Sequence, residues 1–322
     1  MHRLNTFISS ELPAINSALK RETGTLHPLV RPVAEHILDA GGKRLRPVLM
    51  LLTARALGRT GQDLYPVACS LEFLHSATLL HDDILDRADL RRGRPAAHLD
   101  FGEHKTVLTG DALLALANDI VARTGDPDMT RCIAQAIIQT ATGEILEIAA
   151  IRDTSLTSAG YLEIITGKTA YLIQAACELG ARMAGADDEK ITRAKGYGVN
   201  LGIAFQLVDD ALDYSSSAGT SGKPRGGDLR EGKFTLPLLL FLESLEPQER
   251  DELRAGLARE TLTEAELHTI TARIDAEGFA AATRVAAEEY LARARACLEC
   301  FSASPEKALL EAVLEYVLIR EK

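Results

Sequence analysis

Apolar residues recur at every third or fourth position along nearly the whole chain. This spacing matches an α-helix of about 3.6 residues per turn, which presents one apolar face to a core. We find no convincing strand pattern of alternating apolar and polar residues, and no Gly-rich nucleotide-binding loop after a strand. The pattern therefore predicts an all-α protein with helices over residues 4–20, 28–40, 44–58, 63–87, 105–124, 128–151, 156–186, 188–215 and 233–244, followed by several shorter ones.

Two stretches interrupt this pattern, at residues 88–104 and 214–232. Long loops inside a compact domain are often lids or binding loops. The apolar pattern resumes at once on both sides of each stretch, so neither is typical of an interdomain linker. We therefore expect one large helical domain over residues 1–322, with a less strongly patterned part near the C-terminus.

The composition is ordinary for a globular protein, but it lacks Trp and contains only 5% aromatic residues, so the core must be aliphatic. The formal net charge of −10 excludes a general nucleic-acid-binding protein, because phosphate backbones bind to basic surfaces. Basic residues that cluster within such an acidic chain indicate instead one local anionic ligand.

The five cysteines are scattered, so we expect no disulfide scaffold, and the single CxxC pair of Cys297 and Cys300 lacks the second pair that a zinc site needs. The N-terminal residues contain neither an apolar signal core nor an Arg-rich transit pattern. The longest apolar runs, Val48–Leu52 and Leu236–Leu242, are far too short to cross a bilayer. These features predict a cytoplasmic protein without a transmembrane segment.

The strongest chemical signal is a DDxxD motif that occurs twice, each time at the end of an apolar helical run. Residues four apart share one face of a helix, so the first and last carboxylates of each motif point the same way. One such motif is more often a solvated helix end, but two of them, after the apolar runs ATLLH and FQLV, favour a functional role. The six carboxylates belong to Asp82, Asp83, Asp86, Asp209, Asp210 and Asp213.

Carboxylates held this close repel each other, and a hard divalent cation removes that repulsion. Mg²⁺ typically takes one or two carboxylates and completes its shell with water and substrate phosphate. Two such clusters on facing helices would hold a metal-bridged diphosphate between them. We therefore predict that the six aspartates are metal ligands at a catalytic centre.

Basic residues accompany the acidic motifs. The segment GGKRLRP, residues 41–47, opens a predicted helix after a Gly-rich turn, and a helix N-terminus with free N–H groups favours anions. Lys43 and Arg46 add charge there, although such a segment alone is often only a surface turn. The segment RRGRP, residues 91–95, is a second basic segment and follows just after the first acidic motif. Basic groups near metal ligands indicate a phosphate group whose oxygens are bound by the metal and by the basic side chains together. Three further lysines follow along the chain: Lys168, Lys223 and Lys233.

Taken together, these segments resemble the trans-isoprenyl diphosphate synthases of the polyprenyl synthetase family, in particular its long-chain, octaprenyl-type members. GGKRLRP, LLHDDILD, DLRRGRP, GKTA, FQLVDDALDY and GDLREGKFTLP occur in the order and spacing of that family, within about residues 40–240. The resemblance implies an isoprenoid-synthase-like bundle of helices around a central apolar cavity. One departure is Gly227, which stands where many relatives carry another acid, so Asp228 is a less certain metal partner.

The resemblance also implies a role for each matching residue. The six aspartates would hold up to three Mg²⁺ ions on the allylic diphosphate, and Lys168 would take part in catalysis. The same diphosphate would be contacted by Arg91, Lys168, Thr169, Gln206, Lys223 and Lys233. Isopentenyl diphosphate would be bound by Gly42, Lys43, Arg46, His75 and Arg92.

The predicted reaction is the head-to-tail condensation of isopentenyl diphosphate with an allylic diphosphate such as farnesyl diphosphate. A terpene cyclase or a head-to-head synthase is a competing interpretation, but a cyclase needs one diphosphate site, and the two basic segments indicate a second. A short-chain synthase and a non-catalytic subunit of a heteromeric synthase are further alternatives. Such subunits usually lack acids from one motif, whereas both motifs are whole here. A homodimer is implied by the family alone.

Small residues precede the first acidic motif on its predicted helix. Short-chain members of the family commonly place a bulky aromatic residue four or five positions before the motif, where this chain has Thr78 and Ala77. At about 1.5 Å rise per residue, Ala77 would lie roughly 7–8 Å deeper along the helix than Asp82, where the growing tail would pass. We therefore predict a long-chain product, unless the opposing wall around Ile145 to Ile148 closes the tunnel.

Overall fold

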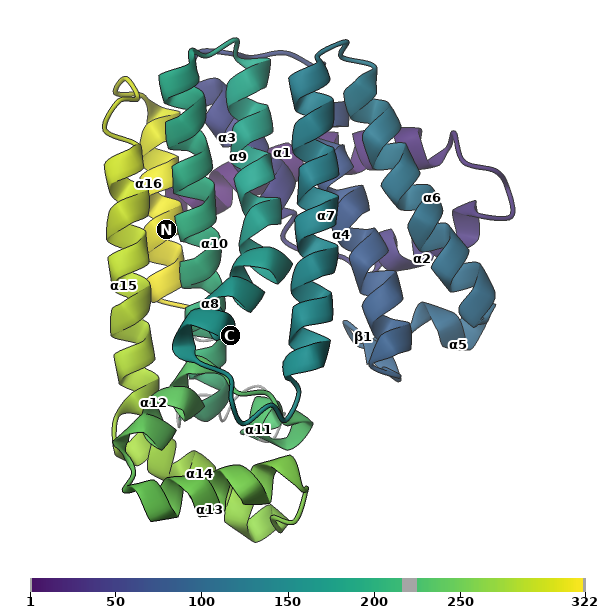
Figure 1. The fold of residues 1–322 in the computed structure, drawn as a ribbon. Coiled ribbons are helices and arrows are strands. Elements are labelled where there is room, and N and C mark those ends of the chain that lie inside the picture. The colour runs from purple at the N-terminus through teal and green to yellow at the C-terminus, as the bar shows by residue number, and fades with distance from the viewer. Residues whose placement is uncertain (1, 216–224, 321–322) are drawn as a thin grey trace. The chain divides into compact units, whose positions relative to one another are not determined.

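The computed structural model describes residues 2–215 and 225–320 (Figure 1). Helices dominate both ranges, so the prediction of an all-α protein is confirmed. The elements are α1 (His2–Thr23), α2 (Arg31–Asp39), α3 (Leu45–Ala56), α4 (Leu64–Leu85), β1 (Leu90–Arg91), β2 (Arg94–Pro95), α5 (Ala97–Phe101), α6 (Glu103–Ala122), α7 (Pro127–Ala150), α8 (Ser158–Ile165), the π-helix η1 (Thr166–Ala170), α9 (Tyr171–Met183), α10 (Asp188–Tyr214), α11 (Gly227–Glu231), α12 (Leu236–Ser244), α13 (Pro247–Ala258), α14 (Glu264–Ala276), α15 (Phe279–Cys297) and α16 (Pro305–Leu318).

The chain folds as two compact units. The first unit contains the residues up to Ile138 together with Leu172–Lys195 and Glu299–Ala312. The second unit contains Gln139–Tyr171, Gly196–Leu298 and the residues from Val313 onward. The prediction of one domain stays a prediction.

Helix α4 is the centre of the first unit. Its side chains are buried on nearly all sides, among them Phe73, Leu74 and Ala77, as expected for a helix that is apolar all round. It packs most extensively against α6, and also against α3 and α1. Figure 1 shows α6 beside α4, with α5 near the C-terminal end of α4. This packing fixes the helix end that carries the first acidic motif.

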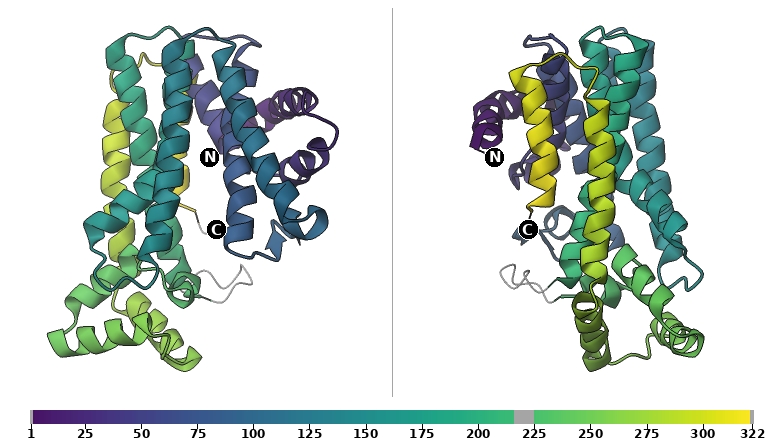
Figure 2. Two further views of the ribbon diagram at one scale, coloured as in Figure 1. Left: turned by 45° about the vertical axis from the view of Figure 1, so that its right-hand side comes forward. Right: turned by 90° about the vertical axis from the view of Figure 1, so that its left-hand side faces the viewer.

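The second unit is built around α10, α12, α14 and α15. Phe241 of α12 and Phe279 of α15 meet edge to face, with 5.7 Å between their ring centroids. Both views of Figure 2 show α12, α13 and α14 gathered at one end of α15. The end of α10 is anchored by Tyr214, which is completely buried. The second acidic motif therefore also lies at a fixed helix end.

The structure differs from the predicted elements in three places, one of which is the helix α11 within the stretch 214–232 that was expected as a loop. The stretch 88–104, expected as a loop, contains the two-residue antiparallel hairpin β1–β2 and the short helix α5. The helix expected over 156–186 is divided into α8, η1 and α9, because five residues form a wider π turn. Hydrophobic periodicity does not reveal one extra residue in a turn, so this feature could not be predicted.

Among the residues that the structure describes, no helix combines the length and the hydropathy needed to cross a membrane.

Candidate active site

The first acidic motif ends α4 in the first unit. Asp83 is fully buried, and its Oδ1 accepts a hydrogen bond from Nε of Arg91 at 2.7 Å, with Nη2 of the same guanidinium also in contact. Its second oxygen, Oδ2, is buried without a hydrogen-bond partner in the described part of the chain. Asp82 is half-buried and Asp86 is exposed. One predicted diphosphate contact, Arg91, is therefore held by the acidic motif itself.

The hairpin after α4 brings the two basic segments together. Arg92 and Gly93 occupy its turn with positive φ angles of 52° and 78°, as a two-residue hairpin turn of the I′ type requires. The Arg92 guanidinium donates a hydrogen bond to the carbonyl oxygen of Gly41. A Cβ atom on Gly42 would lie only 2.9 Å from Nη1 of Arg92, so glycine is needed for this approach. GGKRLRP and RRGRP thus lie against each other, and their role as one binding site stays a prediction.

Arg46 and His75 lie in the same electropositive surroundings. Burial lowers the pKa of the His75 imidazole well below its ordinary value, and the charges of Arg46 and Arg92 lower it further, so His75 is neutral. Burial also lowers the pKa of the Arg46 guanidinium, and the negative charge of Glu72 offsets part of this lowering. Because the positive charges of Arg44, Arg46 and Arg92 outnumber the single carboxylate of Glu72 beside them, the cluster retains positive charge and suits an anion. Lys43, on the same segment, is exposed.

Two residues of this cluster were not assigned from the sequence. Arg44 is buried in the left-handed conformation at the N-cap of α3, and its guanidinium bonds Glu72 Oε1 at 2.6 Å and the Leu38 carbonyl oxygen at 2.5 Å. It is therefore a structural anchor for the start of α3. Glu72 lies on α4 within an apolar run, and only its partner Arg44 explains a buried carboxylate at that position.

The predicted chain-length residues lie on α4 beneath the first motif. Ala77 has no exposed surface. Thr78 is half-buried, and its hydroxyl donates to the carbonyl oxygen of His75 at 2.9 Å. Both side chains are small, and their role in product length stays a prediction.

The second acidic motif ends α10 in the second unit, and Asp210 is its buried member. Tyr161 Oη donates to Oδ2 of Asp210 at 2.5 Å, and Gln206 Nε2 donates to Oδ1 at 2.7 Å. Thr169 Oγ1 in turn donates to Gln206 Oε1 at 2.9 Å. Burial raises the pKa of Asp210 to about 7. Gln206 and Thr169, predicted to contact the diphosphate, are thus linked to the acidic motif, and Tyr161 is a partner that no sequence motif indicated.

Asp213 and Asp209 have different partners. The two oxygens of Asp213 accept backbone hydrogen bonds from Gly227 at 3.1 Å and Asp228 at 3.0 Å, at the start of α11. Burial raises the pKa of Asp228 well above its ordinary value, and the nearby Asp210 and Asp213 raise it further. Asp209 is exposed and pairs with Nη1 of Arg320 at 3.0 Å. Arg320 lies outside every motif, so no pattern in the sequence indicated this ion pair.

The predicted lysines of the second unit meet two glutamates. Lys168 lies on η1, where its ammonium group contacts Glu144 and Glu147 of α7. Lys233 contacts Glu147 as well. No motif in the sequence indicates a role for either glutamate, because acidic residues on a helix are usually solvated. Lys223 lies outside the described residues.

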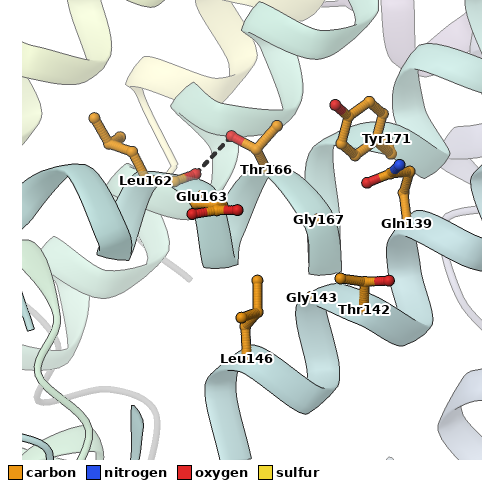
Figure 3. A pocket seen from close by; sticks show the side chains of 9 residues that line it. All are labelled: Gln139, Thr142, Gly143, Leu146, Leu162, Glu163, Thr166, Gly167 and Tyr171. Carbon is orange, nitrogen blue, oxygen red and sulfur yellow. Dashed lines mark hydrogen bonds between the residues drawn. The ribbon is translucent and has the colours of Figure 1, made fainter. Parts of the chain in front are cut away.

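The π-helix η1 reaches α7 through two glycines. A Cβ atom on Gly143 would lie 2.2 Å from the backbone nitrogen of Lys168, and one on Gly167 would lie 2.7 Å from Cα of Gly143. The backbones are therefore in direct contact, which brings Lys168 to α7. Figure 3 shows a pocket of about 250 Å³ beside this crossing. None of the predicted site residues is among those that line it: Gln139, Thr142, Gly143, Leu146, Leu162, Glu163, Thr166, Gly167 and Tyr171.

The donor chemistry of the two acidic motifs suits a hard divalent cation. Within the described ranges, no group of three or more His, Cys, Asp or Glu side chains is gathered into a preformed metal cluster. Each motif nevertheless offers only carboxylate oxygens, which are the hard ligands that Mg²⁺ prefers, and the buried Oδ2 of Asp83 lacks a partner. These residues fit an ion that takes one or two carboxylates and obtains its other ligands from water and substrate.

Comparison with known proteins shows which family and which solved structures the chain is similar to. Residues 27–274 match the family model described as polyprenyl synthetase. The chain is 32% identical over 322 residues to octaprenyl diphosphate synthase of Escherichia coli K12, covering 100% of this chain and 99% of that protein. It is 34% identical to geranylgeranyl diphosphate synthase of Methanosarcina mazei, covering 92% and 93%. Among solved structures, polyprenyl synthase of Caulobacter crescentus CB15, complexed with calcium and isoprenyl diphosphate, has a TM-score of 0.91 at 38% identity and covers 100% and 98%.

Proposed function

The chain belongs to the polyprenyl synthetase family, and we propose that it is a magnesium-dependent enzyme that elongates an allylic diphosphate with isopentenyl diphosphate to a long-chain polyprenyl diphosphate. The observation that carries the elongation reaction is the contact between Arg92 and the Gly41–Gly42 backbone. It creates an anion site of arginines in addition to the two acidic motifs. Cyclization of a single diphosphate has no use for such a second site.

The chain's own residues account for binding and for stabilisation of the leaving group. Arg46 and Arg92 hold the diphosphate of isopentenyl diphosphate, while the neutral His75 offers a hydrogen bond without adding charge. Arg91, Lys168 and Lys233 bind the allylic diphosphate and stabilise the negative charge that develops as its C–O bond breaks. The double bond of isopentenyl diphosphate then attacks the allylic cation, and a proton leaves with the departed diphosphate as acceptor.

The metal is proposed to be Mg²⁺, with up to three ions. When bound, these ions neutralise charge on the allylic diphosphate. The calcium and isoprenyl diphosphate in the Caulobacter crescentus relative support a site for a divalent cation and a diphosphate in this family. The acidic residues that would hold the ions are the six aspartates of the two motifs.

A homodimer and a long-chain product complete the proposal. Ile145 and Ile148 on α7 are 66% and 49% exposed, which is unusual for large apolar side chains near each other on one helix. A second copy of the chain would cover them. The small residues Ala77 and Thr78, and the octaprenyl product in the name of the Escherichia coli relative, support a long chain. A geranylgeranyl-type short chain is the second candidate, favoured by the relative from Methanosarcina mazei. Residence in the cytoplasm stays a prediction of the sequence.

The test is an assay of the purified chain alone with labelled isopentenyl diphosphate, farnesyl diphosphate and Mg²⁺. We expect diphosphate release and a labelled product that chromatography sizes as a long chain, both abolished by excess chelator. Release of diphosphate from farnesyl diphosphate without isopentenyl diphosphate would indicate a cyclase. No release under any condition would indicate a non-catalytic subunit.

A further inference from the structure

Glu147 forms ion pairs with two lysines of the second unit, Lys168 and Lys233. Its Oε2 contacts Nζ of Lys168, and its other oxygen, Oε1, lies 3.6 Å from Nζ of Lys233. Glu144 adds a second contact to Lys168, with 2.9 Å between Oε2 and Nζ. Glu231 adds a second contact to Lys233, with 2.8 Å between Oε2 and Nζ. Among the residues that the structure describes, only Glu147 is shared, so it connects the two ammonium groups.

Backbone packing brings these groups together. Glu144 and Glu147 lie one turn apart on α7 and therefore share a face. The Gly143–Gly167 crossing holds the π-helix against this face, so Lys168 reaches both carboxylates. Lys233 follows α11, where its backbone N–H donates to the carbonyl oxygen of Asp228 at 2.9 Å. The cluster thus depends on three separate segments of the second unit.

The number of donors decides what the lysines can still bind. An ammonium group has three N–H donors. Lys168 meets one oxygen of Glu147 and both oxygens of Glu144, at 2.9 and 3.2 Å, so a donor remains where the two Glu144 oxygens share one N–H. Lys233 bonds Glu231 at 2.8 Å, and its 3.6 Å ion pair with Glu147 is too long for a hydrogen bond, so it keeps donors for a further anion. Burial lowers the pKa of each lysine, but the carboxylates more than offset this effect, and the pKa of both is raised overall. Both lysines are therefore charged at neutral pH.

We propose that Glu147 is a positioning residue that holds Lys168 and Lys233 side by side, so that their remaining N–H groups meet one and the same diphosphate. This inference rests on the proposed function, which gives the two lysines their ligand. Without Glu147 each long side chain would regain its rotamer freedom, and diphosphate binding would have to order it again.

The direction in which diphosphate affinity changes when Glu147 is neutralised separates a positioning role from simple charge repulsion. A carboxylate next to an anion site repels the anion, so its neutralisation should strengthen diphosphate binding by Coulomb's law alone. A positioning role predicts the opposite result. The change Glu147→Gln keeps the shape of the side chain and removes its charge, which makes it the suitable variant.

The experiment measures binding of inorganic diphosphate with Mg²⁺ by titration calorimetry, together with steady-state kinetics. We expect Glu147→Gln to weaken diphosphate binding and kcat/KM for the allylic substrate about tenfold, with KM for isopentenyl diphosphate unchanged. The matched control is Glu249→Gln, which neutralises a glutamate of the same unit that pairs with Arg273 on the surface, and we expect it to leave binding unchanged. Unchanged or tighter diphosphate binding in Glu147→Gln would overturn the proposal.

Two further variants distinguish a positioning role of Glu147 from other causes of weaker diphosphate binding. In a chain that already carries Lys168→Ala and Lys233→Ala, adding Glu147→Gln should cause no further loss of diphosphate binding, because a positioning residue acts only through its partners. A further loss of the same size would contradict the role. If Glu147→Gln does not fold, Glu144→Gln decides, with an expected loss of about threefold since it releases one lysine only. A wild-type chain without condensation activity would refute the proposed function, whereas an active chain with unaffected variants would refute this inference alone.

Discussion

Arg92 lies so close to Gly42 that a Cβ atom at position 42 would come within 2.9 Å of its guanidinium. We predict that Gly42→Ala displaces Arg92 and raises KM for isopentenyl diphosphate about tenfold, which corresponds to the loss of one charge-assisted phosphate contact. KM for the allylic diphosphate should stay the same. Steady-state kinetics with each substrate varied in turn measures the difference.

Gly41→Ala is the control for this change. Gly41 also has a positive φ, 83°, so alanine is strained there too, but a Cβ atom at this position would meet no other atom within 4 Å. Backbone strain alone should therefore appear in both variants, and loss of the Arg92 contact only in Gly42→Ala. Equal effects on KM would mean that strain, and not the approach of Arg92, explains the need for glycine.

The members of the first acidic motif should respond differently to substitution. Asp82→Asn should lower kcat at least about a hundredfold, because it removes a metal ligand, and leave thermal stability intact. Asp83→Ala should also lower the free energy of unfolding by roughly 1–3 kcal/mol, since it leaves the Arg91 guanidinium without its buried partner. Thermal unfolding in chelator separates the two variants. A collapse of stability in Asp82→Asn would make this residue structural.

The raised pKa of Asp210 makes the free energy of unfolding of the metal-free protein depend on pH in a predictable direction. Burial raises this pKa to about 7, above the unfolded value of 3.8, so the folded state binds a proton more tightly. The stability from this group is complete below the unfolded pKa and is lost as the pH rises through 7. Asp228, whose pKa is also raised, acts in the same direction.

We therefore expect the free energy of unfolding in chelator to fall between about pH 4 and pH 8, and Asp210→Asn to flatten much of that slope. Denaturant titrations at several pH values measure it. Tyr161→Phe should shift the fall to higher pH, because the Tyr161 hydroxyl lowers the Asp210 pKa. A slope that is unaffected in Asp210→Asn would assign the titration to another group.

The elements and the acidic motifs were predictable because they depend on local sequence. Helical periodicity gave most of the helices, and the spacing of Asp82 and Asp209 within their motifs marked two helix ends. The helices and the two acidic motifs follow from residue type and spacing alone. That Gly42 and Arg92 serve one substrate was implied only by the resemblance to the family, and it stays a prediction.

The partners of the site residues were not predictable, because they depend on tertiary packing. Glu147 reaches Lys168 only through a π turn and a crossing of two glycines, and neither has a periodic signal. Tyr161 and Arg320 bond the second acidic motif from segments that carry no motif. Many polar side chains on helices have the same sequence pattern, and only the tertiary structure shows which of them bonds a site residue.

Product length is best tested at Thr78, because the burial of the two predicted chain-length residues differs. Ala77 has no exposed surface, so a phenylalanine there would overpack the core of the first unit and cost about 1–3 kcal/mol. Thr78 is half-buried, and its hydroxyl bonds to the carbonyl oxygen of His75 on its own helix, so a ring at this position would extend a side chain that is already partly exposed. Thr78→Phe should shift the product distribution toward shorter chains at nearly unchanged stability, whereas Ala77→Phe should do so with a lowered melting temperature. Chromatographic sizing of the labelled products and thermal unfolding measure both effects, with Thr78→Val as the control that removes the hydroxyl and keeps the size. If Thr78→Phe leaves the product distribution as it is, the end of the product tunnel does not lie along this face of α4.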